Sequence, residues 1–481
     1  MKKRFVQLTG VLLLSAWAAN AVAAGSIRFE PYIFEARSGE KVEAEKGVFE
    51  VPENRSKPGS RTLKLAFVRF ASTNPDKGPP IIYLAGGPGG SGVDAARGRR
   101  FPLFMALREV ADVIALDQRG TGWSNDIPPC DVPTGPDDGK PLTRDQIVEQ
   151  TRKAMAECAR FFREKGVDLA GYNTNESADD IEELRRLLGV PKVSLWGISY
   201  GTHLALATLK RHGSSIDRAV LASIEGLDET VKLPALTDAF FGRLQKVIEA
   251  DPVASKIYPD FVGTMRRVHA GVEKEPATAV IKDAAGQERK VSFSLFELQL
   301  LLSASIADPS RSSMLPALCA MMDRGDFTQP AALIHRMLRA QPMVRISGMA
   351  EAMDAASGIS PSRARLVERQ AKSALVGDAL NYPMPHMADS LGVPDLGESF
   401  RSPVTSDVPT LFLSGTLDGR TYPESAAEIA SRFARATRVI VENGGHNIFE
   451  QDPAVAGAVV AFMKGEPVAS TILLPPPQFP H

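Results

Sequence analysis

The sequence has few of the features that mark nucleic-acid-binding or disulfide-stabilised proteins. Its 481 residues include only three cysteines, and 56 Lys and Arg residues balance 57 Asp and Glu residues, for a formal net charge of −1. Three cysteines cannot build a disulfide scaffold. A balanced charge provides no field that would attract nucleic acid or an acidic membrane surface. We therefore expect no nucleic-acid partner and a small, roughly neutral ligand.

Signatures of metal and nucleotide sites are also missing. The chain contains no H-E-x-x-H motif, no paired C-x-x-C motif and no G-K-[ST] motif. We therefore predict neither a metal nor another cofactor. With 44% hydrophobic and 23% charged residues, the composition is that of an ordinary globular protein and excludes disorder, collagen-like repetition and a coiled coil.

Long apolar runs are absent beyond the first two dozen residues. Those residues combine a basic start (Met1 to Arg4), an apolar stretch (Phe5 to Ala19) and the small-x-small motif Ala21-Val22-Ala23. The apolar stretch is shorter than the roughly 20 residues that a membrane helix needs, and no Cys follows to take a lipid. We predict a signal peptide over 1–23 and a periplasmic or secreted protein without a membrane anchor. The oligomeric state stays open.

Two interpretations of the cysteines remain open. Cys130 and Cys158 flank a loop rich in Pro and Gly, so a disulfide between them would close a short loop in an oxidising compartment. Alternatively, both residues and Cys319 are buried or free thiols, because spacing alone fixes no pairing.

Short apolar runs that end in turns alternate with segments of helical periodicity, which is typical of an α/β fold. Several runs are continuously apolar, as parallel strands covered on both faces require. The predicted strands are 62–72, Ile81 to Ala85, Val113 to Leu116, Val193 to Trp196, Ala219 to Ile224, Leu411 to Ser414 and Val439 to Val441. Helical spacing with an acidic first turn predicts a helix from Glu176 to Leu188.

This alternation stops after Ile224 and resumes near Pro409. We predict a core over 24–224 and 409–466, with a mainly helical cap inserted over 225–408. The cap would lie over the carboxyl edge of the sheet, where ligands bind in open parallel sheets. It would contain one hairpin around Gly286. A Pro-rich tail would follow over 467–481, and we expect its low-complexity part, Leu474 to Pro477, to be loose. An independent domain joined by linkers is the alternative for 225–408.

Gly197-Ile198-Ser199-Tyr200-Gly201 matches G-x-S-x-G between a predicted strand and a predicted helix. That context is typical of a nucleophile elbow, in which glycines permit a sharp turn that exposes Ser199 at the start of the helix. A strand-to-helix turn without chemistry is the alternative. His203 follows four residues later on the helix, so we expect it to be packed or solvated rather than catalytic.

A serine nucleophile requires a base that is oriented by an acid. Asp418 directly follows one predicted strand and His446 follows the next, so both would lie at the carboxyl edge of the sheet. The chain order Ser199, Asp418, His446 is that of α/β-hydrolases. A turn-capping role for Asp418 and a solvated loop histidine are the alternatives.

The loop Gly86-Gly87-Pro88-Gly89-Gly90-Ser91-Gly92 allows two interpretations. Its G-x-G-x-x-G spacing after a strand, with Asp117 about 25 residues later, mimics a dinucleotide site. Alternatively, the N–H groups of Gly87 and Tyr200 form an oxyanion hole. We favour the second interpretation because it also accounts for Ser199, Asp418 and His446. In the next loop we expect Asp117 and Arg119 to form a buried ion pair.

Together with Asp117-Gln118-Arg119-Gly120-Thr121-Gly122-Trp123-Ser124, these motifs resemble those of the α/β-hydrolase serine peptidases that include prolyl iminopeptidase and the secreted tripeptidyl aminopeptidases. The resemblance covers roughly 60–225 and 405–465. Prolyl iminopeptidases usually have His before Gly-Gly-Pro-Gly, whereas this chain has Ala85 there. With the export signal and the long insertion, this departure makes the chain look closer to the tripeptidyl aminopeptidases.

The resemblance implies an α/β-hydrolase fold and an exported serine aminopeptidase that acts on short peptides. It also implies that carboxylates under the cap bind the free amino group of the substrate, and Glu225 is our candidate by its position at the start of the cap. A surface or helix-start carboxylate is the alternative for Glu225. A carboxylesterase with the same three residues, and a binding protein without turnover, are the alternative functions.

Overall fold

The computed structural model describes residues 25–134 and 138–480. The predicted signal peptide over 1–23 lies outside these residues. In the described ranges, no helix is both long enough and apolar enough to cross a membrane.

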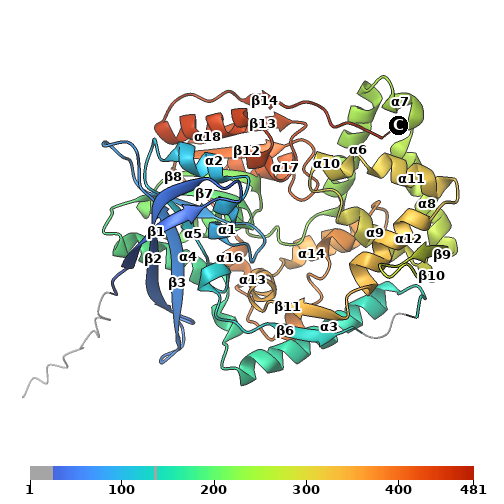
Figure 1. Cartoon of the computed structure of the whole chain (residues 1–481), viewed down its shortest axis with the longest axis horizontal. Coiled ribbons are helices and arrows are strands. Elements are labelled where there is room, and N and C mark those ends of the chain that lie inside the picture. Colours follow the sequence, from blue (N-terminus) through green and yellow to red (C-terminus); the bar gives the residue numbers. More distant parts are fainter. Residues whose placement is uncertain (1–24, 135–137, 481) are drawn as a thin grey trace, which may run out of the picture.

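A ten-stranded sheet forms the centre of the core, in the order β1-β2-β3-β5-β4-β7-β8-β12-β13-β14 (Figure 1). The pairs from β5 to β14 are parallel, whereas β1, β2 and β3 extend one edge antiparallel. The predicted α/β class with a mostly parallel sheet is confirmed. The strands are β1 Arg28–Glu35, β2 Lys41–Pro52, β3 Thr62–Phe70, β4 Ile81–Leu84, β5 Val113–Leu116, β6 Cys130–Pro133, β7 Val193–Ser199, β8 Ile216–Ile224, β9 Ala277–Lys282, β10 Glu288–Phe293, β11 Met343–Ile346, β12 Thr410–Gly415, β13 Ala436–Glu442 and β14 Thr471–Leu473.

Helices cover both faces of the parallel strands. In β4, Ile81 and Tyr83 belong to one hydrophobic cluster and Ile82 and Leu84 to another, because alternate residues of a strand point to opposite faces. Residues of α1, α2 and α18 fill the first cluster, and residues of α4, α5 and α17 fill the second. The helices of the core are α1 Gly92–Arg97, α2 Phe101–Leu107, α3 Arg144–Glu164, α4 Thr174–Leu187, α5 Tyr200–His212, α17 Pro423–Ala430 and α18 Pro453–Lys464.

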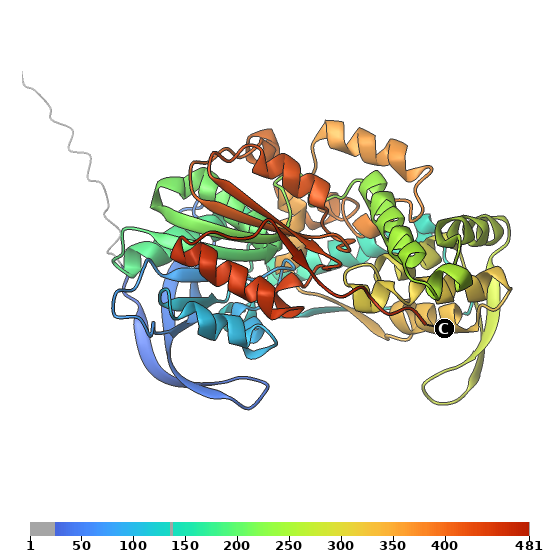
Figure 2. The same ribbon diagram turned by 90° about the horizontal axis from the view of Figure 1, so that it is seen from above.

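Between β8 and β12 the chain leaves the sheet and is mainly helical; we call residues 225–408 the cap. Figures 1 and 2 show it beside the sheet. The predicted hairpin is present, because β9 and β10 pair antiparallel. The cap has a hydrophobic cluster of its own, whereas α13 packs into a cluster of the core. The helices of the cap are α6 Pro234–Ala250, α7 Ala254–Ile257, α8 Phe261–Lys274, α9 Leu295–Ser303, α10 Pro309–Ser312, α11 Leu315–Asp323, α12 Thr328–Ile334, α13 Met349–Ser357, α14 Pro361–Ala371, α15 Ala388–Leu391 and α16 Gly397–Arg401.

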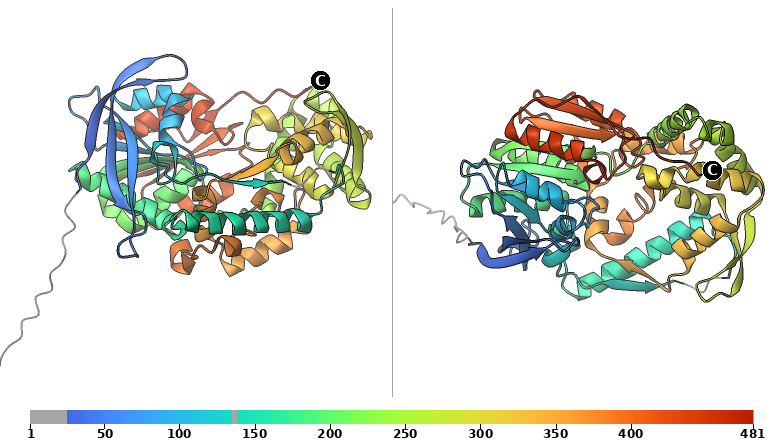
Figure 3. Two further views of the ribbon diagram at one scale, coloured as in Figure 1. Left: turned by 60° about the horizontal axis from the view of Figure 1, so that its bottom comes forward. Right: turned by 45° about the horizontal axis from the view of Figure 1, so that its top comes forward.

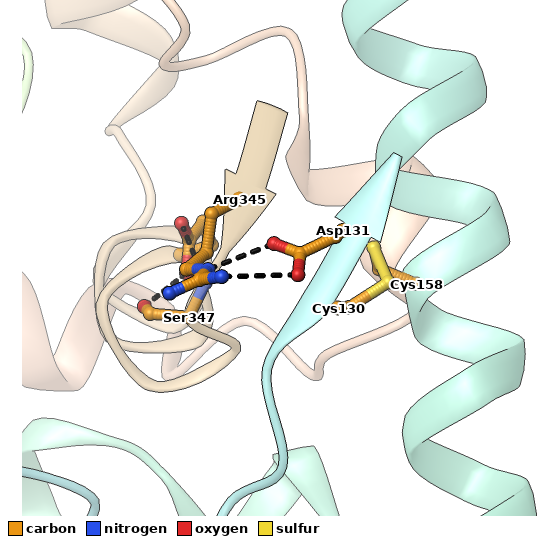
Figure 4. The surroundings of a disulfide bond; sticks show 6 residues. Cys130, Asp131, Cys158, Arg345 and Ser347 are labelled. Atoms are coloured by element: carbon orange, nitrogen blue, oxygen red, sulfur yellow. Dashed lines mark hydrogen bonds and ion pairs between the residues drawn. A yellow bond between two sulfur atoms is a disulfide. The ribbon is translucent and has the colours of Figure 1, made fainter. Parts of the chain in front are cut away.

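A disulfide joins Cys130 of β6 to Cys158 of α3 (Figure 4), so the structure decides between the two interpretations of the cysteines. Cys319 is free and buried. Beside the disulfide, β6 pairs with β11 of the cap, and Arg345 binds both carboxylate oxygens of Asp131 at 2.8 and 3.1 Å. Figure 3 shows α3 running along both core and cap. The disulfide therefore fixes a strand that connects the two.

The C-terminal tail is bound to both core and cap, so the expectation of a loose tail was wrong. β14 extends the sheet beside β13. Farther on, Phe479 is 4% exposed within the cap's hydrophobic cluster, and the hydroxyl of Tyr258 donates to the carbonyl of Pro480 at 2.8 Å. The pairing of β14 and the buried side chain of Phe479 thus anchor a segment whose Pro-rich composition resembles a flexible end.

Candidate active site

Ser199 stands at the junction of β7 and α5 in a strained conformation, with φ 54° and ψ −129°. The two flanking glycines make this turn possible. A Cβ on Gly201 would lie 2.0 Å from the carbonyl oxygen of Leu84, and one on Gly197 would lie 2.6 Å from that of Gly201. A side chain at either position would therefore force the strands or the helix apart. The sharp strand–turn–helix arrangement expected around Ser199 is present.

Backbone strain gathers at one edge of the sheet. The described residues include three non-glycine residues with positive φ, namely Ser199, Ser223 at 52° and Asn443 at 61°. They lie at or just beyond the carboxyl ends of β7, β8 and β13. Strain of this kind is concentrated at functional sites. Ser223 also contacts the predicted base, because its hydroxyl donates to the carbonyl of His446 at 2.7 Å.

Asp418 and His446 lie together as predicted. The imidazole Nδ1 is 2.9 Å from Oδ2 and 3.1 Å from Oδ1 of Asp418, which is 1% exposed. Burial opposes ionisation of Asp418, but the charge and hydrogen bond of His446, together with Thr421, outweigh it and lower the pKa. An ionised Asp418 holds the proton on Nδ1 and leaves Nε2 as the basic nitrogen. Asp418 also has the turn-capping role, accepting from the N–H groups of Arg420 and Thr421.

The sheet brings the loops that carry these residues to the same edge, because β7, β8, β12 and β13 are consecutive. Ser199 is in register with Ile224, next to the Ser223 that holds His446. Within the described chain, the Ser199 hydroxyl makes no hydrogen bond, so it is uncommitted. The carboxyl edge therefore combines an unbound hydroxyl with an oriented imidazole.

The Gly-rich loop passes directly over Ser199. A Cβ on Gly86 would lie 3.0 Å from Cβ and 3.7 Å from Oγ of Ser199. The carbonyl of Gly86 accepts from the N–H of Gly90 at 3.0 Å. Because the C=O and N–H of a trans peptide point in opposite directions, this bond directs the N–H of Gly87 away from the turn. The loop's backbone is thus fixed beside the serine.

The expected ion pair between Asp117 and Arg119 is wrong. Asp117 instead accepts from the hydroxyl of Ser91 at 2.6 Å and from the N–H groups of Val93 and Trp123 at 3.1 and 2.8 Å. Burial raises its pKa against these hydrogen bonds. Its carboxylate is therefore used to hold the Gly-rich loop and is not free to bind a ribose, as a dinucleotide site would require.

Arg119 points the other way from this loop and is fully buried. It binds both carboxylate oxygens of Asp180 on α4 at 2.7 Å and donates to the carbonyls of Glu53 and Gly171. Two nearby side chains of the same tight loop thus have different partners, which spacing alone did not predict.

Glu225 lies at the carboxyl end of β8 and is buried. Its Oε2 is 2.6 Å from Nζ of Lys232, and its Oε1 is 4.0 Å from Nδ1 of His203. Burial opposes its ionisation, but Lys232 and His203 outweigh this and lower the pKa. His203 is packed, as expected, between the carbonyl of Gly226 and the hydroxyl of Ser357. The candidate amino anchor thus already has a cation beside it.

Sequence reasoning missed a second carboxylate, Asp354 on α13. This helix lies against the elbow and the Gly-rich loop, because the hydroxyl of Tyr200 is 3.1 Å from the sulfur of Met353 and a Cβ on Gly89 would lie 3.4 Å from Cβ of Ala350. Asp354 has no ion pair among the described residues. Burial, followed by the charge of Glu225, raises its pKa well above the ordinary value. No motif marks this helix, so the sequence carries no signal for it.

Over the described ranges, no three His, Cys, Asp or Glu side chains are grouped so that they could hold a metal ion.

Comparison with known proteins identifies the fold and related peptidases. The alpha/beta hydrolase fold family matches residues 79–453. Serine protease Hip1 of Mycobacterium tuberculosis is 30% identical over 170 residues, which cover 34% of this chain and 32% of that protein. The tripeptidyl aminopeptidase of Streptomyces coelicolor is 28% identical over 192 residues, covering 37% and 34%. A putative proline iminopeptidase of Mycoplasma genitalium is 28% identical over 151 residues, covering 31% and 34%.

The matches thus span about a third of the length of these curated relatives. The family match confirms the predicted α/β-hydrolase fold, and the three relatives confirm the resemblance to this group of serine peptidases.

Proposed function

This chain belongs to the α/β-hydrolase fold family, and on that premise we propose that it is an exported serine aminopeptidase. It would release residues or short peptides from the amino end of peptide substrates. The observation that carries the proposal is the Asp418–His446 pair, 2.9 Å apart, at the same sheet edge as the strained Ser199. The peptidase relatives and the predicted signal peptide also support it.

In the proposed reaction, Oγ of Ser199 attacks the scissile carbonyl while Nε2 of His446 takes its proton. Asp418 keeps the imidazole oriented and stabilises the imidazolium. His446 then gives the proton to the leaving amine, the C–N bond breaks, and an ester of Ser199 remains. Water, activated by the same imidazole, hydrolyses that ester and regenerates the hydroxyl.

The N–H groups of Gly87 and Tyr200 are the proposed oxyanion donors. The position of Gly86 beside Ser199, and the bond from Gly90 that fixes the Gly86–Gly87 peptide, support the first donor. Tyr200 supports the second, because it is the first residue of α5, where N–H groups have no partner within the helix. Preorganised donors of this kind are worth about 2.7–4 kcal/mol each in the transition state.

Glu225 and Asp354 are the proposed anchors for the substrate's amino group. Lys232 forms an ion pair with Glu225, whereas Asp354 has none among the described residues. Burial is the larger cause of the raised pKa of Asp354, and the charge of Glu225 adds to it. An N-terminal ammonium bound between the two carboxylates would favour the ionised form of Asp354 and hold the peptide by its free end.

The test compares hydrolysis of a chromogenic tripeptide amide, its N-acetylated form and a short-chain ester by the mature protein. We expect turnover of the amino-free amide and a fall in kcat/KM of at least about 100-fold on N-acetylation. The acetylated substrate loses a charge-assisted contact of about 1.5–3 kcal/mol and leaves a buried carboxylate without its partner. Ser199→Ala should abolish all turnover. Hydrolysis of the ester alone would assign a carboxylesterase instead, and binding without any turnover would assign a non-catalytic protein.

A further inference from the structure

One short segment of the cap binds both loops that carry the proposed acid and base. Residues 306–308 lie in the connection between α9 and α10. The carbonyl of Ile306 accepts from the N–H of Gly419, next to Asp418, at 3.0 Å. The carbonyl of Ala307 accepts from the N–H of His446 itself at 2.8 Å. The cap therefore contacts the loop of Asp418, here called the acid loop, and the loop of His446, here called the base loop. Both contacts are made through neighbouring peptide groups.

Asp308 continues this contact with its side chain. Its Oδ1 accepts from the N–H of Asn447 and from Nε2 of Gln451, both at 2.9 Å, and its Oδ2 accepts from Nδ2 of Asn447 at 2.6 Å. The other amide atom of Gln451 accepts from the N–H of Gly445 at 2.9 Å. One carboxylate thus fixes the residues on both sides of His446, directly at Asn447 and through Gln451 at Gly445.

The base loop needs such support because its own sequence is flexible. Gly444 and Gly445 precede His446, and Asn443 before them holds a positive φ of 61°. On the side of the core, the hydroxyl of Ser223 holds the carbonyl of His446. On the side of the cap, Ala307 and Asp308 hold its N–H and the next residue. The core and the cap therefore both bind the base loop.

We infer that Asp308 is a positioning residue, through which the cap completes the alignment of His446 with Asp418 and Ser199. This inference rests on the proposed function. Asp308 acts through the backbone of the base loop and not by contact with the reacting atoms. A misplacement of a catalytic group by about 1 Å lowers rates by about 100-fold, so loosening this loop should act on turnover more than on substrate binding.

The first test is Asp308→Ala with the amide substrate. We expect kcat to fall by about 10- to 100-fold while KM changes less than about 2-fold. The rate at which a fluorophosphonate labels Ser199 should fall in parallel, because labelling needs the same imidazole. Asp389→Ala removes an exposed carboxylate on α15 of the cap and serves as the matched control with unchanged kinetics.

A reciprocal exchange separates positioning from a general loss of structure. In Asp308→Asn, an NH2 group takes the place of Oδ2 and faces Nδ2 of Asn447. Two donors then oppose each other, so kcat should fall as in Asp308→Ala. Adding Asn447→Asp reverses donor and acceptor: the new amide at 308 can accept from the backbone N–H of 447 and from Gln451, and donate to the new carboxylate. We expect the double variant to regain at least 5-fold in kcat over Asp308→Asn.

The outcomes distinguish a failure of the proposed serine chemistry from a failure of the role of Asp308. Activity that survives Ser199→Ala would overturn the proposed function itself. An inactive Ser199→Ala together with wild-type kcat in Asp308→Ala would overturn only the inference about Asp308. If Asp308→Ala fails to fold, the reciprocal exchange decides: a folded double variant no more active than folded Asp308→Asn would contradict the positioning role.

Discussion

Ser199 holds a backbone conformation, φ 54° and ψ −129°, that costs a residue with a side chain about 1–3 kcal/mol. The fold tolerates this cost because the neighbouring close contacts of Gly197 and Gly201 leave the turn no other path. The turn holds the half-buried side chain of Ser199 at the carboxyl edge, next to the Gly-rich loop. Stability is thus traded for the position of one side chain.

That trade predicts a gain in stability when the side chain is removed entirely. Ser199→Gly should raise the free energy of unfolding by about 1 kcal/mol, because the relief of strain exceeds the entropy that a glycine loses on folding. Ser199→Ala keeps Cβ and should stay near the wild type. Urea denaturation of the three proteins measures the difference, and equal stability of the glycine and alanine variants would contradict the strain argument.

The raised pKa of Asp354 makes a second prediction, on pH. The folded chain binds the proton of Asp354 more tightly than the unfolded chain does, so the free energy of unfolding falls as pH rises above the unfolded-state pKa of about 4. An amide cannot ionise, so Asp354→Asn removes this loss. We expect the Tm of the variant to exceed that of the wild type at pH 8, with the difference shrinking towards pH 4.

Asp389→Asn, at an exposed position, is the control and should show no such trend. A difference in Tm between Asp354→Asn and the wild type that is the same at pH 4 and pH 8 would show that the pKa of Asp354 is not raised in the folded chain.

The turn at Ser199 requires α5 to pack closely against β4. The position of a Cβ on Gly201, 2.0 Å from the carbonyl oxygen of Leu84, lies well inside van der Waals contact with a rigid backbone atom. By contrast, Gly242 in α6 has no neighbouring atom within 4 Å of its Cβ position. A glycine-to-alanine substitution would therefore meet rigid backbone in α5 and open space in α6.

Gly201→Ala should destabilise the chain by more than about 3 kcal/mol or prevent folding, as overpacking against backbone in a core does. Gly242→Ala should instead stabilise it by about 0.5–1 kcal/mol, because alanine is the better helix former. Thermal unfolding followed by circular dichroism measures both. A well-tolerated Gly201→Ala would mean that the elbow is less tightly packed than the structure has it.

In the whole molecule, core and cap are joined at several places far apart in the sequence. The disulfide fixes β6, which pairs with β11 of the cap, and the C-terminal tail runs from β14 to the cap (Figures 1 and 2). Residues 306–308 bind the acid and base loops. The cap's hydrophobic cluster also includes Leu417, the residue before Asp418. The position of the cap and the geometry of the site are therefore coupled.

The tail offers a direct test of this coupling. Phe479→Ala removes a side chain that is 4% exposed and should lower the free energy of unfolding by about 3–5 kcal/mol, the usual loss for a buried Phe. Leu473→Ala, on the same tail but 77% exposed, should change it by less than about 0.5 kcal/mol. Equal effects in urea denaturation would show that the tail is not anchored in the cap.

The central strands and the elbow could be predicted because their signals are local. Continuous apolar runs mark β4 and β5, a largely apolar run marks β7, and the two glycines around Ser199 mark the turn. The proximity of Asp418 and His446 followed from a rule of topology, since the carboxyl ends of parallel strands meet at one edge. Strands β1 and β2 were missed because most of their residues are exposed or half-buried and many are charged, which weakens the alternation.

The parts that could not be predicted depend on contacts across long separations. Asp180 as the partner of Arg119, the electrostatic influence of Glu225 on Asp354, and Asp308 on the base loop each connect distant segments without a motif. The anchoring of Phe479 is of the same kind. Such contacts are decided by the packing of the cap, whose helices carry no pattern that fixes their arrangement.

Labelling of the mature protein with a fluorophosphonate, followed by mapping of the modified residue by mass spectrometry, tests the role of Ser199 most directly. We expect one adduct per chain, on Ser199, loss of hydrolysis in proportion to labelling, and no adduct in Ser199→Ala. Undiminished hydrolysis by a fully Ser199-labelled protein, or an inactivating adduct on another residue, would show that Ser199 is not the nucleophile.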